Sequence, residues 1–339
     1  MVTTVEQLEE FMSIPSKTLI EDVKKLDGDF IILGIGGKMG PTLAYLLKNA
    51  IDEAGTNQRV IGVSRFSNDD LKIQLNSKGI ETISCDLLND SELRELPVVK
   101  NVIYMAGNKF GTAGNEHFTW AMNSYLPGRV AEHYKGSRMV IFSTGNVYPL
   151  SDVKLGGCDE LVSPDPVGEY GQSCLGRERV FTYFSHRDKT PMSIFRLNYA
   201  IDLRYGVLLE VAKSVYNGEP VDVTMGHVNV IWQGSANEYA IRSLIHASTP
   251  PTIFNATGPE ILSVKWVANE FAKYFEKEAI IIGEEAETAL LSNATKAHRI
   301  FGYPSVSIRE LIELIANWIQ NDGELLNKPS HFQERKGQF

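Results

Sequence analysis

The sequence predicts an α/β fold: a doubly wound parallel sheet of the Rossmann type, followed by a smaller C-terminal lobe. Short apolar or β-branched runs alternate with helical segments over the first two-thirds of the chain. The first run, DFIILGIGG, passes through a glycine-rich turn into an amphipathic helix, which is the strand-turn-helix unit of a nucleotide-binding fold. Ligand sites in such sheets lie at the carboxyl ends of the strands.

Composition narrows the class of partner. The 339 residues carry a net charge of −9, which disfavours broad electrostatic contact with nucleic acid or anionic lipid. The expected partner is a small-molecule substrate. The longest apolar runs are too short to span a bilayer, and the N-terminal residues lack a signal-peptide core, so we expect a cytoplasmic protein. The three cysteines form no C-x-x-C pair and the histidines are scattered, so no disulfide or metal site is expected.

The elements follow in order. Residues 1–28 are expected to form a helical extension, interrupted at Pro15, that covers the core. Residues 29–200 form the Rossmann-like domain, with five further strands in RVIGVSRF, ETISCDLL, NVIYMAGN, RMVIFSTGNVY and MSIFRLNYA. Residues 201–325 are assigned mainly to the smaller lobe, with short strands in GEPVDVTMGHVNVIW and a late amphipathic helix, IRELIELIANWIQ.

The C-terminal tail, residues 326–339, is polar. Tails of this kind usually fray, and this is the main expectation. A second hypothesis is that His331, Arg335 and Lys336 fold back over the cleft or over a partner subunit.

The glycine-rich turn after the first strand has the spacing G-x-x-G-x-x-G, at Gly34, Gly37 and Gly40. A tight turn, close approach of backbone to a pyrophosphate and a helix N-terminus all favour glycine at such positions. The alternative is a plain strand-to-helix turn. We expect the turn to hold a dinucleotide cofactor through Gly34, Gly36, Gly37, Lys38, Met39 and Gly40.

The end of the second strand bears on the cofactor type. It reads Val63-Ser64-Arg65, without the acidic residue that would bind the ribose hydroxyls of NAD. Ser64 and Arg65 would instead suit the 2′-phosphate of NADP, so the prediction is NAD(P) with a preference for NADP. The alternative is that Arg65 stacks on adenine or faces solvent.

Later motifs carry a family resemblance. They are Cys85-Asp86-Leu87, Met105-Ala106-Gly107-Asn108-Lys109, Asn123, Ser143-Thr144-Gly145-Asn146-Val147-Tyr148, Tyr170-Gly171-Gln172-Ser173-Cys174 and Arg196-Leu197-Asn198-Tyr199. Together with the glycine turn, these make the chain from about Asp29 to Trp318 resemble an extended short-chain dehydrogenase/reductase of the NAD-dependent epimerase/dehydratase family. The family's active-site motif is Y-x-x-x-K, and this chain has Cys174 at its last place.

The resemblance implies a role for each matching residue. Tyr170 would be the catalytic acid/base, and Thr144 would contact the substrate through its hydroxyl. The cofactor would be bound further by Asp86, Leu87, Ala106, Gly107, Lys109, Asn123 and Asn198. The predicted substrate-binding residues are Asn146, Tyr148, Arg204 and Trp232. The resemblance also implies a possible homodimer that pairs two helices, one of them the Tyr170 helix.

Two other departures restrict the reaction. Gly145-Asn146 replaces the Asp-Glu pair of the family's dehydratases, and neither residue can exchange a proton near neutral pH, which disfavours dehydration. The region GHVNVIWQGSANEYA lacks the usual arginine and paired aspartates. This loss weakens the case for a nucleotide-diphosphate sugar and leaves a free sugar, a sugar acid or a hydroxy acid.

Cys174 leaves three interpretations open. Another cation, from Lys109, Arg177 or Arg204, replaces the missing lysine in an active enzyme; or the protein binds NAD(P) without redox chemistry; or Cys174 itself acts as nucleophile or proton carrier. Cys174 is therefore included with Thr144 and Tyr170 as a candidate catalytic residue. The predicted function is an NAD(P)-dependent oxidoreductase or epimerase for a sugar, sugar acid or other polyhydroxylated molecule. The alternative is a redox-silent sensor or assembly protein.

Overall fold

The computed structural model describes residues 2–109 and 114–337. A seven-stranded sheet runs through the larger part of the molecule, and every pairing in it is parallel. Its strands, in spatial order, are β12 (Thr252–Ala256), β7 (Met192–Leu197), β5 (Arg138–Thr144), β4 (Asn101–Tyr104), β1 (Phe30–Leu33), β2 (Val60–Ser64) and β3 (Glu81–Ser84). The predicted α/β class with a Rossmann-like parallel sheet is confirmed.

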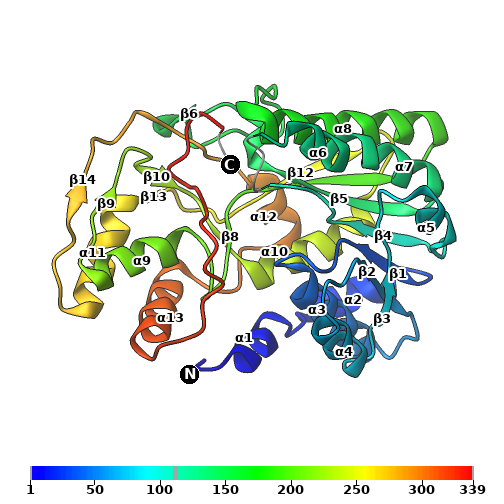
Figure 1. The fold of residues 1–339 in the computed structure, drawn as a ribbon, viewed down its shortest axis with the longest axis horizontal. Helices are drawn as coiled ribbons and strands as arrows, with labels where there is room; N and C mark the ends of the chain where they lie inside the picture. Colours follow the sequence, from blue (N-terminus) through cyan, green and yellow to red (C-terminus); the bar gives the residue numbers. More distant parts are fainter. Residues whose placement is uncertain (1, 110–113, 338–339) are drawn as a thin grey trace.

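Helices cover both faces of this sheet (Figure 1). Counting those of the smaller lobe as well, the α-helices of the described residues are α1 (Val5–Met12), α2 (Lys17–Lys24), α3 (Gly40–Ala54), α4 (Asp70–Ser77), α5 (Asp90–Glu95), α6 (Glu116–Trp120), α7 (Leu126–His133), α8 (Gly168–Asp188), α9 (Val207–Asn217), α10 (Gln233–Arg242), α11 (Val264–Phe275), α12 (Thr295–Phe301) and α13 (Ile308–Gln320). Strand residues alternate between two cores: Ile32 and Ile103 pack with the α3 and α10 side, whereas Ile31 and Val102 pack with the α7 and α8 side. Burial on both faces explains why the central strand β1 is entirely apolar, whereas the edge strand β3 is largely polar and none of its residues is buried.

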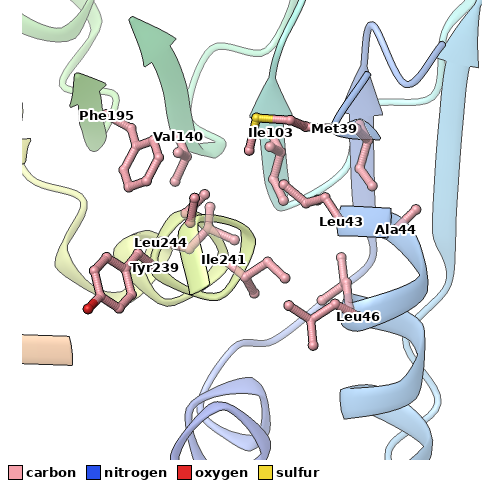
Figure 2. Close-up of a cluster of buried hydrophobic side chains, with 14 of the residues drawn as sticks. Met39, Leu43, Ala44, Leu46, Ile103, Val140, Phe195, Tyr239, Ile241 and Leu244 are labelled. Carbon is pink, nitrogen blue, oxygen red and sulfur yellow. The ribbon is translucent and has the colours of Figure 1, made fainter. Parts of the chain in front are cut away.

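Figure 2 shows the core on the α3 side. Met39, Leu43 and Leu46 come from the start of α3 and the residue before it, and they face Ile103 and Val140 of the sheet. Tyr239, Ile241 and Leu244 approach the same layer from α10 and the turn that follows it, next to Phe195. This packing fixes the start of α3, and with it the glycine-rich turn, against the middle of the sheet.

The N-terminal helices hold the two lobes together. Leu19 and Val23 of α2 pack into the sheet-side core, while Leu8 and Met12 of α1 pack into the core of the smaller lobe. Thr4 and Ser16 accept backbone hydrogen bonds as N-caps of the two helices.

The smaller lobe has its own apolar core, built largely from α9, α11 and α13. Its short strands are β8 (Ala200–Ile201), β9 (Val221–Asp222), β10 (His227–Val228), β11 (Ile231–Trp232), β13 (Leu262–Ser263) and β14 (Ile281–Ile282); β15 (Thr288–Ala289) pairs with β6 (Ser151–Asp152). Residues 201–325 do not lie in this lobe throughout. The chain returns to the sheet at α10, β12 and α12, because β12 pairs with β7 and Phe254 and Phe301 lie in the sheet-side core.

Over residues 326–337 the tail is docked on the protein, contrary to the main expectation that it frays. Figure 1 shows it running from α13 between the smaller lobe and the sheet toward β6. Phe332 is 1% exposed in the core of the smaller lobe, and Ser330 donates its hydroxyl proton to Glu210 of α9 at 2.9 Å. Arg335 donates to the carbonyl and the hydroxyl of Thr288, both at 2.7 Å. Buried apolar area and charge-assisted hydrogen bonds therefore hold the tail in place.

Candidate active site

A cavity of about 430 Å³ opens at the carboxyl ends of the central strands. Its wall on the sheet side includes the glycine-rich turn after β1 and the loop after β4. The chain order of the strands reverses between β1 and β4, and ligands of open α/β sheets bind at that crevice. The opposite wall comes from the segment 199–207 and from the tail.

The glycine-rich turn fits the backbone approach that a pyrophosphate needs. Gly34 has a φ of +93°, and a Cβ there would lie 2.7 Å from the backbone nitrogen of Ala106. A Cβ on Gly40 would lie 2.1 Å from the carbonyl oxygen of Ile35, so α3 can begin this close to β1 only with glycine. Of the predicted turn residues, Gly34, Gly37, Lys38 and Met39 line the cavity.

The residues predicted for the adenosine end lie at the ends of β2 and β3, outside the lining of this cavity. Ser64 sits against Gly36, where an added Cβ would meet its Oγ at 2.5 Å. Arg65 is exposed, and Leu87 is buried in the sheet's second core. Asp86 accepts a hydrogen bond from the backbone nitrogen of Leu88 at 3.1 Å.

Tyr170 and Thr144 lie next to each other on one wall of the cavity. Tyr170 lies at the start of α8, Thr144 ends β5, and both line the cavity with Asn146. Burial raises the pKa of Tyr170 well above its ordinary value, and the neighbouring Cys174 adds to the rise. Arg177 and a hydrogen bond with Thr144 oppose it. The phenol is therefore held in its protonated form, as a proton donor.

Cys174 lies behind this wall. Its thiol is fully buried one helical turn after Tyr170, and burial raises its pKa. The Tyr170 hydroxyl donates a hydrogen bond to it, which raises the pKa of Tyr170 and lowers that of Cys174. Burial outweighs this contact at the sulfur, so the thiol stays protonated and is not an attacking thiolate.

Of the three cations that the sequence suggested, Arg177 acts on both members of this pair, and its effect on Cys174 exceeds that of Lys109. Its guanidinium donates to the carbonyl oxygen of Phe142 at 2.8 Å and to Oδ1 of Asn123 at 2.6 Å. It does not line the cavity, but its charge acts on both Tyr170 and Cys174. Arg204, by contrast, is paired with Asp202 and Glu9.

Asn123 organises the loop after β4. It lies on a π-helical turn, Ala121–Tyr125, and is fully buried. Its Oδ1 accepts from the backbone nitrogen of Asn108 and its Nδ2 donates to the carbonyl of Asn108, each at 2.8 Å. Asn123 therefore positions Gly107 and Lys109, which line the cavity, rather than lining it itself.

Three predicted substrate residues lie outside the cavity. Tyr148 is 2% exposed, and its hydroxyl bonds Asn255 and Arg196 at 2.9 and 2.7 Å. Trp232 is buried in the smaller lobe beside Phe11. Arg204 points toward Asp202. Asn146 is the one residue of the predicted substrate set that lines the cavity. From the predicted cofactor set, Asn198 also lines it, whereas Ala106 is buried beside Gly34.

Sequence reasoning missed several cavity residues. Tyr199, Tyr205, Lys328 and Ser330 line the wall opposite the glycine turn. Tyr199 has a φ of 43°, which turns the chain directly after β7. The one available signal was Phe332, an apolar residue in a polar tail, because a buried anchor there would bring its neighbours to the cleft.

Comparisons with known proteins identify solved structures that share this fold. No family model matches the sequence, and no curated protein matches it. Solved structures match along nearly their whole length. The UDP-glucose 4-epimerase of Thermotoga maritima, solved with UDP-glucose, has a TM-score of 0.70 at 14% identity, covering 87% of this chain and 99% of that one. The UDP-glucuronic acid 4-epimerase of Bacillus cereus, with UDP-glucuronic acid and NAD, has a TM-score of 0.69 at 18% identity, covering 86% and 99%.

A third match is the UDP-glucose 4-epimerase of Thermus thermophilus with NAD, at a TM-score of 0.69 and 15% identity, covering 86% and 99%. At these identities the likeness establishes the fold, and it is consistent with the family resemblance of the motifs. Within the described ranges, no helix has the length and apolar character needed to cross a bilayer. No trio of potential metal ligands gathers among those same residues.

Proposed function

We propose that this chain binds NAD(P) and catalyses hydride transfer on a small polyhydroxylated molecule, as an oxidoreductase or epimerase. The observation that carries the proposal is that Tyr170 and Thr144 line the same cavity as Gly34, Gly37 and Gly107. A proton donor and a turn suited to a dinucleotide thus open onto one space. The matched structures that contain NAD support the cofactor type.

The cofactor, Tyr170 and Thr144 have separate roles in the proposed reaction. When bound, the nicotinamide supplies or accepts the hydride. Tyr170 gives its proton to a carbonyl oxygen during reduction, and takes it from a hydroxyl during oxidation. Thr144 orients that oxygen. Because the phenol is protonated in the resting site, reduction starts from the populated form, whereas oxidation must first remove the proton.

Arg177 takes over part of the role of the missing lysine. It lowers the pKa of Tyr170 from behind the wall, without reaching into the cavity. This supports the first interpretation of Cys174, an active enzyme with a substitute cation. The buried, protonated thiol counts against the nucleophile. NADP remains our preferred cofactor because Arg65 is exposed beside Ser64 at the end of β2. A homodimer through α8 remains part of the proposal.

The test is calorimetric titration with NAD, NADP and their reduced forms, followed by turnover assays with sugars, sugar acids and their keto forms. Tyr170→Phe is the matched variant, because it keeps the ring and removes only the hydroxyl. We expect cofactor binding in both proteins and turnover in the wild type alone. Equal turnover in both would remove Tyr170 from the mechanism.

A redox-silent binder is the second candidate, and Cys174 is the observation that favours it. Tight cofactor binding with no turnover of any substrate in the panel, together with turnover after Cys174→Lys, would support that function. Absence of cofactor binding to the wild type would contradict both candidates.

A further inference from the structure

We propose that the cavity contains an anion subsite, formed by Lys38, Lys109 and Lys328, that takes the carboxylate or phosphate group of the substrate. The proposal deepens the proposed function and rests on it: the substrate would be an acidic sugar derivative rather than a neutral polyol. All three lysines line the cavity.

Two of the lysines cross from the cofactor wall to the opposite wall. Lys38 follows the glycine turn, yet its Nζ donates to the carbonyl oxygen of Ala200 at 3.0 Å and lies 3.9 Å from the ring centroid of Tyr205. Lys109 follows β4, and its Nζ donates to the carbonyl oxygen of Ser330 at 3.5 Å. Their charges therefore gather on the side of the smaller lobe, away from the backbone that would hold a pyrophosphate.

The third lysine comes from the tail, and its position is fixed on both sides. Before it, the backbone nitrogen of Leu326 donates to the carbonyl of Arg204 at 3.1 Å. After it, Ser330 donates both its backbone and its hydroxyl proton to Glu210. Lys328 thus joins the wall toward which Lys38 and Lys109 point.

The carboxylates around this cluster already have partners. Asp202 accepts from the backbone nitrogen of Arg204 at 2.7 Å and from its guanidinium at 3.1 Å. Arg204 also reaches Glu9 at 3.4 Å, and Glu210 accepts from Ser330. Glu210 keeps its negative charge beside Lys109, because Ser330 is a neutral donor. The four cations Lys38, Lys109, Lys328 and Arg204 therefore face the three carboxylates Asp202, Glu9 and Glu210, and a bound anion would balance the remaining positive charge.

The pKa values of Lys38 and Lys109 are lowered in this cluster. Burial lowers the pKa of Lys38 to about 7, with Asp202 opposing the shift and Lys109, Arg204 and Lys328 adding to it. Burial lowers the pKa of Lys109 to about 8, opposed chiefly by the charge of Glu210. An anion beside them favours their charged forms, so its binding should take up protons near pH 8.

The experiment measures this uptake by calorimetry at pH 8, in two buffers of different ionisation enthalpy, on protein saturated with its cofactor. The probes are gluconate, glucose 6-phosphate, inorganic phosphate and the neutral sorbitol. We expect the anions to bind at least about tenfold more tightly than sorbitol and with net proton uptake. Comparison of the acid with the two phosphates identifies which anionic group the subsite prefers.

Variants test whether the lysines cause the tighter binding of anions. Lys328→Met should weaken binding of the anions by about tenfold or more while leaving sorbitol unchanged. Lys336→Met is the matched control in the same tail, because Lys336 is exposed and outside the cavity lining. If Lys328→Met disturbs the tail, as judged by its melting curve, Lys328→Gln, which keeps a long polar side chain without the charge, provides the same comparison.

Two results would overturn the subsite. One is that no probe anion binds more tightly than sorbitol. The other is that proton uptake accompanies the cofactor alone and the anions add none, which would assign the lysines to the cofactor phosphates. In either case, cofactor binding and Tyr170-dependent turnover still test the proposed function separately. If the anions bind but the cofactor does not, the proposed function is contradicted and the anion subsite is not.

Discussion

The guanidinium of Arg177 donates a hydrogen bond to Oδ1 of Asn123 at 2.6 Å, and both side chains are buried behind the cavity wall. The same Oδ1 accepts from the backbone of Asn108 at 2.8 Å. One buried contact therefore couples the cation behind Tyr170 to the loop that carries Lys109.

Arg177→Leu should destabilise the protein by about 3 kcal/mol, because it leaves the buried carbonyl of Phe142 without its charged donor. It should also raise the pKa of Tyr170 further, since Arg177 lowers it. Chemical denaturation measures the first effect. Arg179→Leu, an exposed arginine two residues along α8, is the control and should change stability by less than about 0.5 kcal/mol. Equal effects of the two variants would contradict a special role for Arg177.

Cys174→Lys should lower the pKa of Tyr170, because it replaces a neutral thiol with a cation one helical turn away. The rising limb of any oxidation rate against pH should move to lower pH, since oxidation requires the deprotonated phenol. Ultraviolet difference titration against Tyr170→Phe in the same background measures the shift directly. Cys174→Met adds no charge and removes only the thiol's own upward effect on the pKa, so it should shift the titration less than lysine does. An equal shift in the two variants would mean that loss of the thiol, and not the added cation, causes it.

The buried pair of Glu178 and Arg196 should be costly to break. Their closest oxygen and nitrogen are 2.6 Å apart, and each side chain is 2% exposed. Glu178→Gln should therefore lower the free energy of unfolding by about 3–5 kcal/mol, because Arg196 is left buried without its countercharge. The double variant Glu178→Leu with Arg196→Met should lose less than the sum of the single changes in urea denaturation. Strict additivity would argue against coupling.

Removal of the tail before Asn327 should open the cavity and lower stability, because it removes Phe332 from the core of the smaller lobe and Lys328 from the cavity wall. Phe332→Ala should account for most of the stability loss, about 3 kcal/mol or more. Thermal melting and limited proteolysis of the tail measure both effects. His331→Ala, next to the anchor and only half-buried, is the comparison. Unchanged stability and ligand binding in the truncated protein would contradict a structural role for the tail.

Lys38 should make stability depend on alkaline pH. Its folded pKa of about 7 lies below its ordinary value of 10.5, so between these values the unfolded chain binds a proton that the folded chain has lost. Stability should therefore rise with pH across this window. Below pH 7 the folded protein bears the full cost of burying a charged lysine, and deprotonation of Lys38 above pH 7 relieves that cost. Lys38→Met should flatten that rise, as measured by denaturation at pH 7, 8.5 and 10. Parallel curves for the two proteins would refute the assignment.

The sheet and the glycine turn could be predicted from sequence because their signals are local. Apolar runs bounded by turns define β1 to β5 and β7, and the spacing of Gly34, Gly37 and Gly40 defines the turn. The strand β12 was not predicted, because its run lies in a region where the alternation of strands and helices has loosened.

The substrate wall required long-range information. Trp232 packs beside Phe11, more than 200 residues earlier in the chain, and Tyr148 is turned inward by the short 3₁₀ turn Gly145–Val147. No local pattern separates such residues from residues that line a cleft. The same is true of Lys328, because its place depends on where Phe332 docks.

The return of the chain to the sheet at β12 restricts how the two lobes can move. A protein whose domains are joined by one linker can open around a single hinge. Here the chain passes between the lobes at β8, α10, β12 and α12, and the tail crosses again. A wide opening would have to bend several of these connections at once. We expect ligands to enter through small displacements of the wall, chiefly the tail, and we expect neither lobe to fold when expressed without the other.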